Sequence, residues 1–204
     1  MDKINYSESE KIELVKENGY NIKLFENPSE EVQIYAVKRV GFSIKYIKNP
    51  SEEVQLAAVT KDGRAIQFIK NPSEKIKLAA IKQNTFCIKF MDDPSEEVQL
   101  ESVKENGYSI QFIRNPSEAV KLAAVKETGM ALQYIVNPSP EIQIEAIKNT
   151  TLAYTAVTSY AVIKNTRQYW DDNFYYDLFT NQFKLTPEQR KEILEEYNML
   201  QLFK

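Results

Sequence analysis

Apolar side chains in residues 27–48 follow the spacing of one helix face, and after Gly41 a second run of the same kind begins. Residues expected to face the interior are Val32, Ile34, Ala36 and Val37 in the first run, and Ile44, Tyr46 and Ile47 in the second. At about 100° per residue, each run forms one broad apolar arc. The pattern therefore predicts two short helices in this segment.

The same pattern recurs along most of the chain. Prolines fall at residues 28, 50, 72, 94, 116 and 138, a constant step of 22 residues, and copies start near residues 5, 27, 49, 71, 93, 115 and 137. Positions 1 to 22 are counted from these starts. A unit of two short helices cannot bury its own apolar face, so neighbouring copies must stack. We predict an all-α protein, an α-solenoid of about seven two-helix repeats.

Turn and cap residues mark where these helices begin and end. Asn27-Pro28-Ser29-Glu30 predicts an N-cap at the asparagine, with proline at the first helical position. In the seventh copy Pro140 replaces the glutamate, so Ser139 is the expected cap there. All five glycines occupy position 15, where we expect a left-handed residue to end the first helix. The second helix, α or 3₁₀, is expected over positions 16 to 22.

The period fails after Val157, which predicts two parts, a solenoid over residues 1–158 and an aromatic-rich helical cap over 159–204. Residues 159–165 resemble a shortened copy, and residues 168–176 hold the only tryptophan, Trp170. The sequence Thr186-Pro187-Glu188-Gln189 predicts a capping box and a final helix through about Leu202. A structural cap for the last repeat is the favoured interpretation. A docking surface around Trp170 is the alternative.

The composition excludes several classes of function. The chain has 26 Lys plus Arg against 29 Asp plus Glu, which is not the balance of a generally basic nucleic-acid coat. It contains no histidine, so Ser-His-Asp and Cys-His catalysis and His-ligated zinc are impossible on this chain. Most carboxylates recur once per copy at capping positions, and Asp171, Asp172 and Asp177 form only a weak Mg²⁺ candidate. We therefore expect no enzyme, no cofactor and no metal site.

The start of the chain and its cysteine content bear on its location. Residues 1–5 lack the apolar stretch of a signal peptide, and a lone cysteine, Cys87, cannot form an internal disulfide. No apolar run approaches the roughly 18 residues of a membrane span. These features predict a cytoplasmic protein that does not enter a membrane.

The segment Asp93-Pro94-Ser95-Glu96-Glu97-Val98-Gln99-Leu100 resembles short bacterial HEAT-like repeats, which show Asp-Pro, then Glu-Val-Arg, then small and apolar residues. The frame is most similar to the leucine-rich-variant type, which alternates an α-helix with a 3₁₀-helix. The resemblance covers residues 5 to about 158, with Gln or Lys in place of Arg at position 7. It implies a binding scaffold and no particular partner.

Polar residues at positions 7 and 12 of the first helix have structural explanations. Position 7 is Gln or Lys in every copy, and its side chain is expected to bond the next copy's Asn-Pro-Ser loop as a ladder. Position 12 is lysine in six copies, near the helix C-terminus, where a cation complements the helix dipole. A phosphate-binding stripe is the less favoured explanation of position 12.

The solvent face of the second helix is the candidate binding surface. Positions 19 and 22 are rich in cations, and position 16 carries aromatic rings that either complete the core or contact a partner. The candidate residues are Tyr20, Phe42, Lys45, Lys48, Arg64, Lys70, Phe86, Lys89, Tyr108 and Arg114, with Trp170 added from the C-terminal region.

The favoured function is non-enzymatic binding of another protein. An inhibitor, for instance a phage-encoded factor that blocks a bacterial defence enzyme, is one form such a small module could take. Binding of nucleic acid through the basic face of the second helix is the alternative. An enzyme or small-ligand binder is the third hypothesis, and it would require a deep pocket with converging carboxylates.

Overall fold

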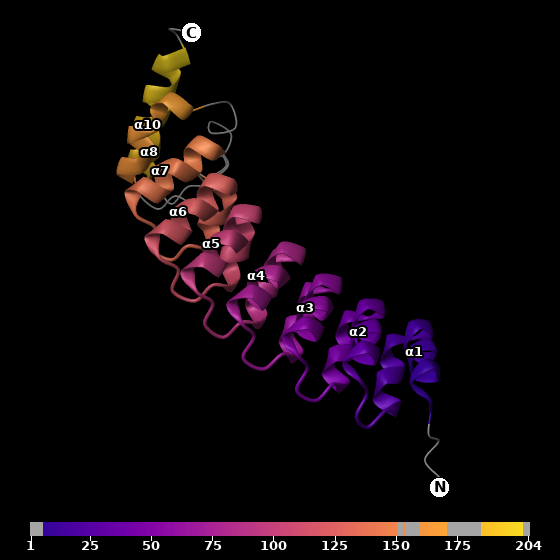
Figure 1. Ribbon diagram of the computed structural model, residues 1–204. Coiled ribbons are helices and arrows are strands. Elements are labelled where there is room, and N and C mark those ends of the chain that lie inside the picture. Colours follow the sequence, from indigo (N-terminus) through magenta and orange to yellow (C-terminus); the bar gives the residue numbers. More distant parts are fainter. Residues whose placement is uncertain (1–5, 151–152, 154–159, 171–184, 202–204) are drawn as a thin grey trace. The chain divides into compact units, whose positions relative to one another are not determined.

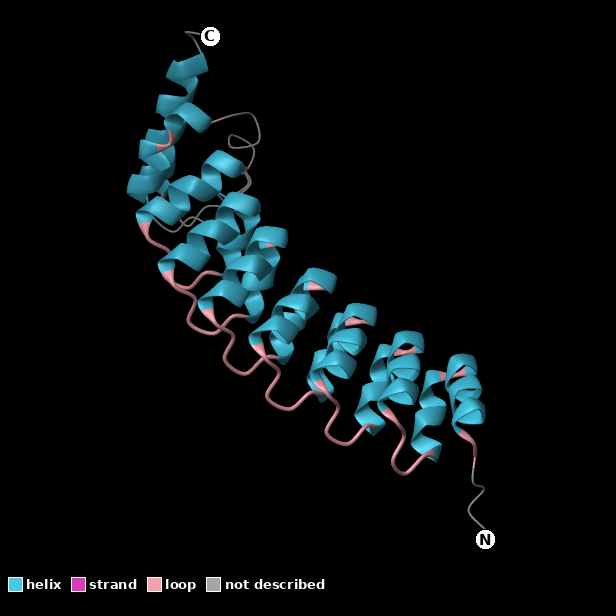
Figure 2. Cartoon of the chain, viewed as in Figure 1, coloured by secondary structure: helices cyan, strands magenta, loops and turns pink. Residues whose placement is uncertain are grey.

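The computed structural model describes residues 6–150, 153, 160–170 and 185–201, which form helices and loops without any strand in these ranges (Figure 1, Figure 2). The chain divides into two compact units, residues 1–102 and 103–204. The expected boundary near residue 158 lies outside the described residues.

Each α-helix of the repeats is followed by a 3₁₀-helix, labelled η. The first unit contains α1 (Glu8–Glu17), η1 (Gly19–Leu24), α2 (Glu30–Arg39), η2 (Gly41–Tyr46), α3 (Glu52–Lys61), η3 (Gly63–Phe68), α4 (Glu74–Gln83) and η4 (Thr85–Phe90). Helix α5 (Glu96–Glu105) spans the boundary between the units. The second unit contains η5 (Gly107–Phe112), α6 (Glu118–Glu127), η6 (Gly129–Tyr134), α7 (Pro140–Asn149), α8 (Tyr160–Asn165), η8 (Arg167–Tyr169) and α10 (Pro187–Gln201).

Within each unit the helices form two stacked layers. Successive α-helices contact one another, as do successive 3₁₀-helices, and each 3₁₀-helix also contacts the α-helix of the next copy. Examples are the pairs α2 with α3, η2 with η3, and η2 with α3 in the first unit. This arrangement confirms the predicted all-α solenoid of stacked helix pairs.

The core lies between the two layers. On the α-helices the predicted interior positions are buried at Val32, Ala36 and Val37, and the 3₁₀-helices contribute Ile44 and Ile47. A 3₁₀-helix has three residues per turn, so positions 15, 18 and 21 share its buried face. Tyr46 at position 20, predicted to face the interior, is 42% exposed, although Ser43 at position 17, one turn earlier on the same side of the helix, is buried. That prediction was wrong, because the Tyr46 ring packs against the Tyr20 ring and leaves part of its surface exposed.

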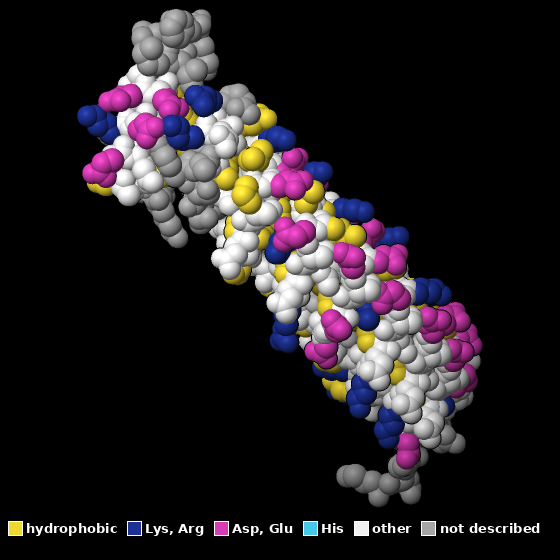
Figure 3. Space-filling model, turned by 90° about the vertical axis from the view of Figure 1, so that its left-hand side faces the viewer, with side chains coloured by type: hydrophobic (Ala, Val, Ile, Leu, Met, Phe, Trp, Pro, Cys, Tyr) yellow, Lys and Arg dark blue, Asp and Glu magenta, His cyan; other side chains and the backbone are white. Residues whose placement is uncertain are grey.

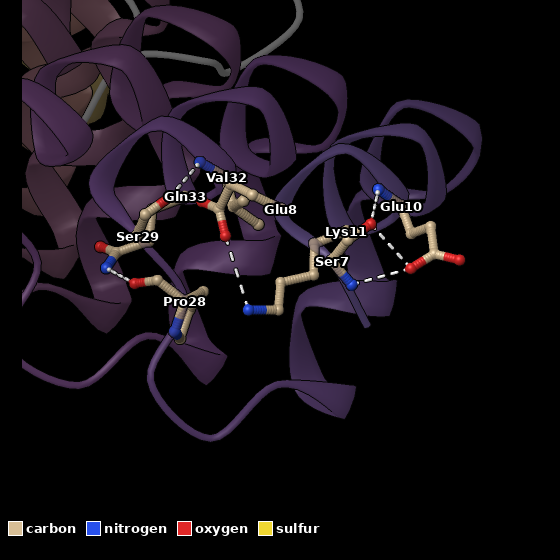
Figure 4. A network of polar contacts seen from close by, with 8 residues as sticks. All are labelled: Ser7, Glu8, Glu10, Lys11, Pro28, Ser29, Val32 and Gln33. Atoms are coloured by element: carbon tan, nitrogen blue, oxygen red, sulfur yellow. Dashed lines mark hydrogen bonds and ion pairs between the residues drawn. The ribbon is translucent and has the colours of Figure 1, made fainter. Parts of the chain in front are cut away.

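Serine at position 3, rather than asparagine at position 1, is the N-cap of the repeated α-helices. Ser29 Oγ accepts the backbone N–H of Val32 at 3.3 Å. The prediction of caps at Asn27 with Pro28 inside the helix was wrong, whereas Ser139 with Pro140 in the first turn is confirmed. Figure 4 shows two of these N-termini, including the reciprocal box of Ser7 and Glu10.

The cap serines also link neighbouring copies. Ser73 Oγ donates to a carboxylate oxygen of Glu52, one copy earlier, at 2.8 Å. The same bond joins Ser29 to Glu8, Ser51 to Glu30 and Ser95 to Glu74. A hydrogen-bond ladder therefore runs up the first unit, and its members are serine and glutamate.

Position 7 does not build this ladder, contrary to our prediction. Gln33 Nε2 donates to the carbonyl oxygen of Pro28 at 2.9 Å, within its own copy. Where position 7 is lysine, it pairs with the glutamate of its own helix, as Lys121 does with Glu118 at 2.7 Å. Figure 4 shows both versions, with Lys11 beside Glu8 and Gln33 beside Pro28.

The glycines at position 15 serve a close approach and not a left-handed turn. No glycine among the described residues has a positive φ. A Cβ atom built on Gly107 would lie 2.4 Å from the carbonyl oxygen of Ala124, on the α-helix of the next copy. At Thr85, which replaces the glycine, the facing residue is Ser102, whose Oγ donates to the Thr85 carbonyl at 3.1 Å. Positive φ values of 49–50° occur instead at Asn49, Asn71, Asn115 and Asn137.

The described part of the C-terminal region is a helical end piece of the second unit. Helix α8 contacts α7, and Val162, Ile163 and Trp170 are buried. Lys164 Nζ lies 2.6 Å from Glu192 and 3.0 Å from Glu196, which joins α8 to α10. The predicted capping box at Thr186 and Gln189 is present, with bonds of 3.0 and 3.2 Å.

Candidate interaction surface

In each unit, the outward side of the 3₁₀ layer carries residues that the sequence singled out. We call the side chains at positions 16, 19, 20 and 22 the 3₁₀ face of the unit, in copies one to four for the first unit and in copies five and six for the second. The predicted cations Lys45, Lys48, Lys70 and Lys89 are exposed on the face of the first unit, and Arg114 is exposed on that of the second. Short loops and the Gly-to-carbonyl contacts hold each 3₁₀-helix against the next α-helix, so these side chains project from a rigid base.

The predicted aromatic side chains at position 16 are only partly covered. Phe86 and Tyr108 are 38% and 36% exposed, whereas Tyr20 and Phe42 are half-buried. The rings therefore both complete the core and reach the surface.

Position 20 supplies further exposed apolar side chains that the sequence analysis missed. Tyr46 and Tyr134 are each 42% exposed, Phe68 is 38% and Phe112 is 36%. The sequence analysis counted this position as interior together with positions 18 and 21, and helix spacing alone does not separate it from position 17, which is buried at Ser43 and Cys87. Large apolar side chains at this level of exposure in successive copies are a typical feature of binding surfaces.

Rings at positions 16 and 20 pair across neighbouring copies. Tyr20 meets Tyr46 with ring centroids 6.1 Å apart and planes at 89°, and Phe42 meets Phe68 at 5.5 Å and 77°. In the second unit, Tyr108 meets Tyr134 at 6.2 Å and 85°. These edge-to-face pairs extend the repeat onto the surface and fix the ring orientations.

Cations lie over several of these rings. Lys45 Nζ is 5.5 Å from the ring centroid of Tyr20 and 4.8 Å from that of Tyr46. Lys89 Nζ is 4.9 Å from the Phe90 ring, which belongs to the same 3₁₀-helix. The ring quadrupole attracts the ammonium group, so these contacts hold the lysines on the surface.

Arg64 is part of this surface, but its charge is neutralised within its own copy. Its guanidinium lies 5.2 Å from the Phe42 ring centroid and 2.7 Å from a carboxylate oxygen of Asp62. The hydrogen bonds from Arg64 lower the pKa of Asp62 below its ordinary value. Arg64 therefore contributes shape to the surface more than net charge.

Trp170 does not belong to this surface. It is 4% exposed, and its Nε1 donates to the carbonyl oxygen of Ile163 at 3.2 Å. A buried indole with a backbone partner acts within the C-terminal end piece. We therefore leave Trp170 out of the candidate surface.

Charges of both signs are interspersed on the face that the space-filling view displays, with hydrophobic side chains between them (Figure 3). Acidic residues concentrate in the first turns of the α-helices, for example Glu30 and Glu31, where they complement the helix dipole. At position 12, Lys16 pairs with Glu13 at 2.8 Å and Lys148 with Glu145 at 3.3 Å. These two lysines therefore have partners within their own helices.

A groove of about 600 Å³ lies at the ends of η3 and η4 and their following loops. Its charged lining is mixed, with Lys70 and Lys77 against Asp92 and Asp93. Lys77 is already paired with Glu74 at 3.2 Å. This lining selects no ligand class and does not bring carboxylates together as an acid and a base.

Catalytic chemistry finds no support among the described residues. No group of three metal-ligating side chains occurs in them, and Asp171, Asp172 and Asp177 lie outside them. Cys87 is fully buried, and burial raises the pKa of its thiol to about 12, which keeps it protonated at neutral pH.

No family model, no curated protein and no solved structure matches the chain. Among the described helices, none is long and apolar enough to cross a membrane. The argument for function therefore rests on the surface itself.

Proposed function

We propose that this chain is a non-enzymatic scaffold that binds another protein through the 3₁₀ face. The observation that carries the proposal is the row of partly exposed rings at positions 16 and 20, paired edge to face across copies. Aromatic side chains are enriched where proteins bind one another, because each buries a large area at a small entropic cost.

The arrangement suits a binding function in two ways. The rings are held by their neighbours before a partner arrives, so little conformational entropy is lost on binding. The lysines around them, such as Lys45 and Lys48, are exposed and would attract a partner of opposite charge. The rings then provide most of the binding energy, whereas the cations orient the partner and raise the association rate constant.

The alternation of α- and 3₁₀-helices supports the likeness to leucine-rich-variant and HEAT-like repeats. Membership of that group of repeat proteins is part of our proposal. Proteins of this architecture present extended surfaces, which agrees with a scaffold.

Inhibition of a partner protein, such as a defence enzyme blocked by a phage factor, is the finer form of the proposal. A rigid repeat surface without catalytic chemistry acts on a partner by occupying its surface. A captured enzyme whose activity falls in proportion to complex formation would support this form.

The test compares two pairs of substitutions in one chain. A tagged wild-type protein is used to isolate a partner from the source cell, and binding of the purified partner is then measured. We expect Tyr108→Ala with Arg114→Ala to weaken binding by at least about tenfold, because rings and arginines concentrate interface energy. The matched control, Lys104→Ala with Lys126→Ala on the α-helices, should change it by less than about twofold.

Circular dichroism must show that both double variants keep the parent's helical content. A larger loss of partner affinity in the Lys104→Ala, Lys126→Ala variant would place the binding surface on the α-helical layer and contradict the proposal.

Nucleic-acid binding is the second candidate, supported by the exposed lysines at positions 19 and 22. Retention of DNA or RNA that falls steeply with salt, and that is lost when Lys45 and Lys48 are neutralised, would favour it over protein binding.

A further inference from the structure

The two units differ in the charge of their 3₁₀ faces. At positions 16, 19 and 22, the first unit carries the cations Lys23, Lys45, Lys48, Arg64, Lys70 and Lys89 and the anions Glu26 and Asp92. The second unit has Arg114 as its cation at these positions, with Gln111, Gln133 and Val136 among the others. The positive excess is therefore a property of the first unit, in a protein whose formal charge is −3.

Several of these cations have no carboxylate partner. Lys45, Lys48 and Lys70 form no ion pair with any described residue. By contrast, the lysines at position 7 of the α-helices pair with the glutamate of their own copy, at 3.5 Å for Lys11 and 3.2 Å for Lys77. The 3₁₀ face of the first unit thus keeps positive charge available for a partner.

The rings of this face are poorly placed to stack on nucleobases. Lys45 lies over both Tyr20 and Tyr46, and the guanidinium of Arg64 lies over Phe42. The edge of one ring also meets the face of its neighbour in the T-shaped pairs. Stacking of bases on a single-strand-binding surface requires open ring faces. Cations and neighbouring ring edges therefore already contact the faces of several of these rings.

We propose that the 3₁₀ face of the first unit binds an extended acidic segment of a partner protein. The carboxylates of that segment pair with Lys45, Lys48 and Lys70, and its apolar side chains contact the edges of the Tyr46 and Phe68 rings. This inference rests on the proposed scaffold function and names the chemical class of its partner.

The repeat geometry suits an extended segment. Stacked helices lie about 8–10 Å apart, so Lys45 and Lys48 in copy two are one helix spacing, roughly 10 Å, from Lys70 in copy three, which is about three residues of extended chain. In an extended segment alternate side chains point the same way, so acidic and apolar residues placed at every second position can face the lysines and the rings together.

The test uses a fluorescent peptide of about twelve residues, longer than the estimated span, in which glutamate and leucine take turns at every second position with serine between them. Fluorescence anisotropy measures its affinity for the full chain, with oligo(dT) and the same peptide carrying lysine in place of glutamate as competing probes. We expect the acidic peptide to bind and the other two to bind at least about tenfold more weakly, with affinity falling as salt rises.

Charge reversal locates the site. Lys45→Glu with Lys48→Glu and Lys70→Glu should reduce acidic-peptide affinity by more than about tenfold, whereas the arginine versions should retain it. The matched control, Lys38→Glu with Lys61→Glu and Lys82→Glu, makes the same change in net charge on the α-helices and should alter affinity by less than about threefold. Helical content and melting temperature must match the parent in each variant.

Three outcomes would overturn the inference: equal losses in both triple variants, tighter binding of oligo(dT) than of the acidic peptide, or no binding of the acidic peptide. If the peptide fails while a captured protein still depends on Tyr108 and Arg114, the acidic class is wrong and the scaffold function stands. If binding of a captured protein does not depend on Tyr108 and Arg114 either, the proposed scaffold function is wrong as well.

Discussion

Small residues set the spacing of the copies at the level of single side chains. Position 15 is glycine where the carbonyl of alanine at position 10 of the next copy approaches, as at Gly107 and Ala124. At the one described junction with a Cβ at position 15, Thr85, the residue at position 10 is serine, which bonds the threonine carbonyl. Contact between copies therefore explains the residue types at position 15 of one copy and position 10 of the next.

We expect Gly107→Ala to destabilise the protein by about 1–3 kcal/mol, since its Cβ would force α6 away from η5. The midpoint of urea unfolding measures the effect. Lys104→Ala, at an exposed site on α5, is the control and should change stability by less than about 0.5 kcal/mol. A Gly107→Ala protein with the same urea midpoint as the parent would show that α6 does not lie so close to Gly107.

Cys87 should report on opening of the core. Burial raises its thiol pKa to about 12, so the native protein is expected to react very slowly with Ellman's reagent at pH 8 and quickly once unfolded. A Cys87→Ala, Phe86→Cys variant carries the thiol at a site where the native side chain is 38% exposed, and should react at least about a hundredfold faster. Rapid labelling of native Cys87 would argue against its burial.

At the level of elements, the 3₁₀ geometry aligns positions 15, 18 and 21 with the core, because the helix has three residues per turn. Positions 17 and 20 lie on another side of the helix, where position 17 is buried, as at Ser43 and Cys87, and position 20 is partly exposed. The rings of Tyr46 and Phe68 belong to the surface, which extends the predicted site at position 16. Helix spacing alone therefore does not predict the exposure of these rings.

Glu74, one member of the serine–glutamate ladder, should make the stack sensitive to acid. The hydrogen bond from Ser95, followed by that from Lys77, lowers the pKa of Glu74 below its ordinary value of 4.5. A carboxylate with a lowered folded-state pKa stabilises the fold above the unfolded-state pKa, and this contribution is lost as pH falls through the folded-state pKa. We expect the melting temperature to fall as pH drops below 4.5.

Glu74→Gln tests this link. The variant should melt below the parent at pH 7, and the difference should narrow as pH falls below 4.5, because the parent then loses the same charge. Glu53→Gln, exposed in the first turn of α3, is the matched control, since it removes a charge beside the same end of the helix dipole without breaking the ladder, and it should lower the melting temperature at pH 7 less than Glu74→Gln does. A constant difference for Glu74→Gln across the titration would mean that its charge is not involved.

At the scale of the whole molecule, the C-terminal end piece covers the apolar face of the last described repeat. Ile142 and Ile147 of α7 are buried at 2% and 1% exposure, and α8 contacts α7. Repeat proteins require such terminal covers for solubility.

Deletion of residues 159–204 should therefore give a protein that aggregates or unfolds first at its C-terminal repeat. Size-exclusion chromatography and hydrogen exchange over α7 measure both effects. As a control, Lys164→Gln with Arg167→Gln weakens the ion pairs to Glu192 and Glu196 but keeps the end piece, and should remain monomeric. A soluble, monomeric and fully helical truncation would show that this segment is not a cover.

The sequence by itself determined the repeat, its length, the two-helix unit and the cation-bearing face. Proline, glycine and apolar residues return at fixed positions, and any chain with that period must stack its copies to bury them. Lys45 and Lys48 could be placed on the surface because charged side chains are rarely buried without a partner.

Only the tertiary structure decided the roles of residues whose environment comes from another copy. Gly107 is required by a carbonyl of α6, and Ser73 bonds Glu52 one copy earlier. The exposure of Tyr46 depends on how its ring packs against Tyr20 of the preceding copy. Local sequence reports spacing along one chain segment, whereas these contacts depend on how closely neighbouring backbones approach.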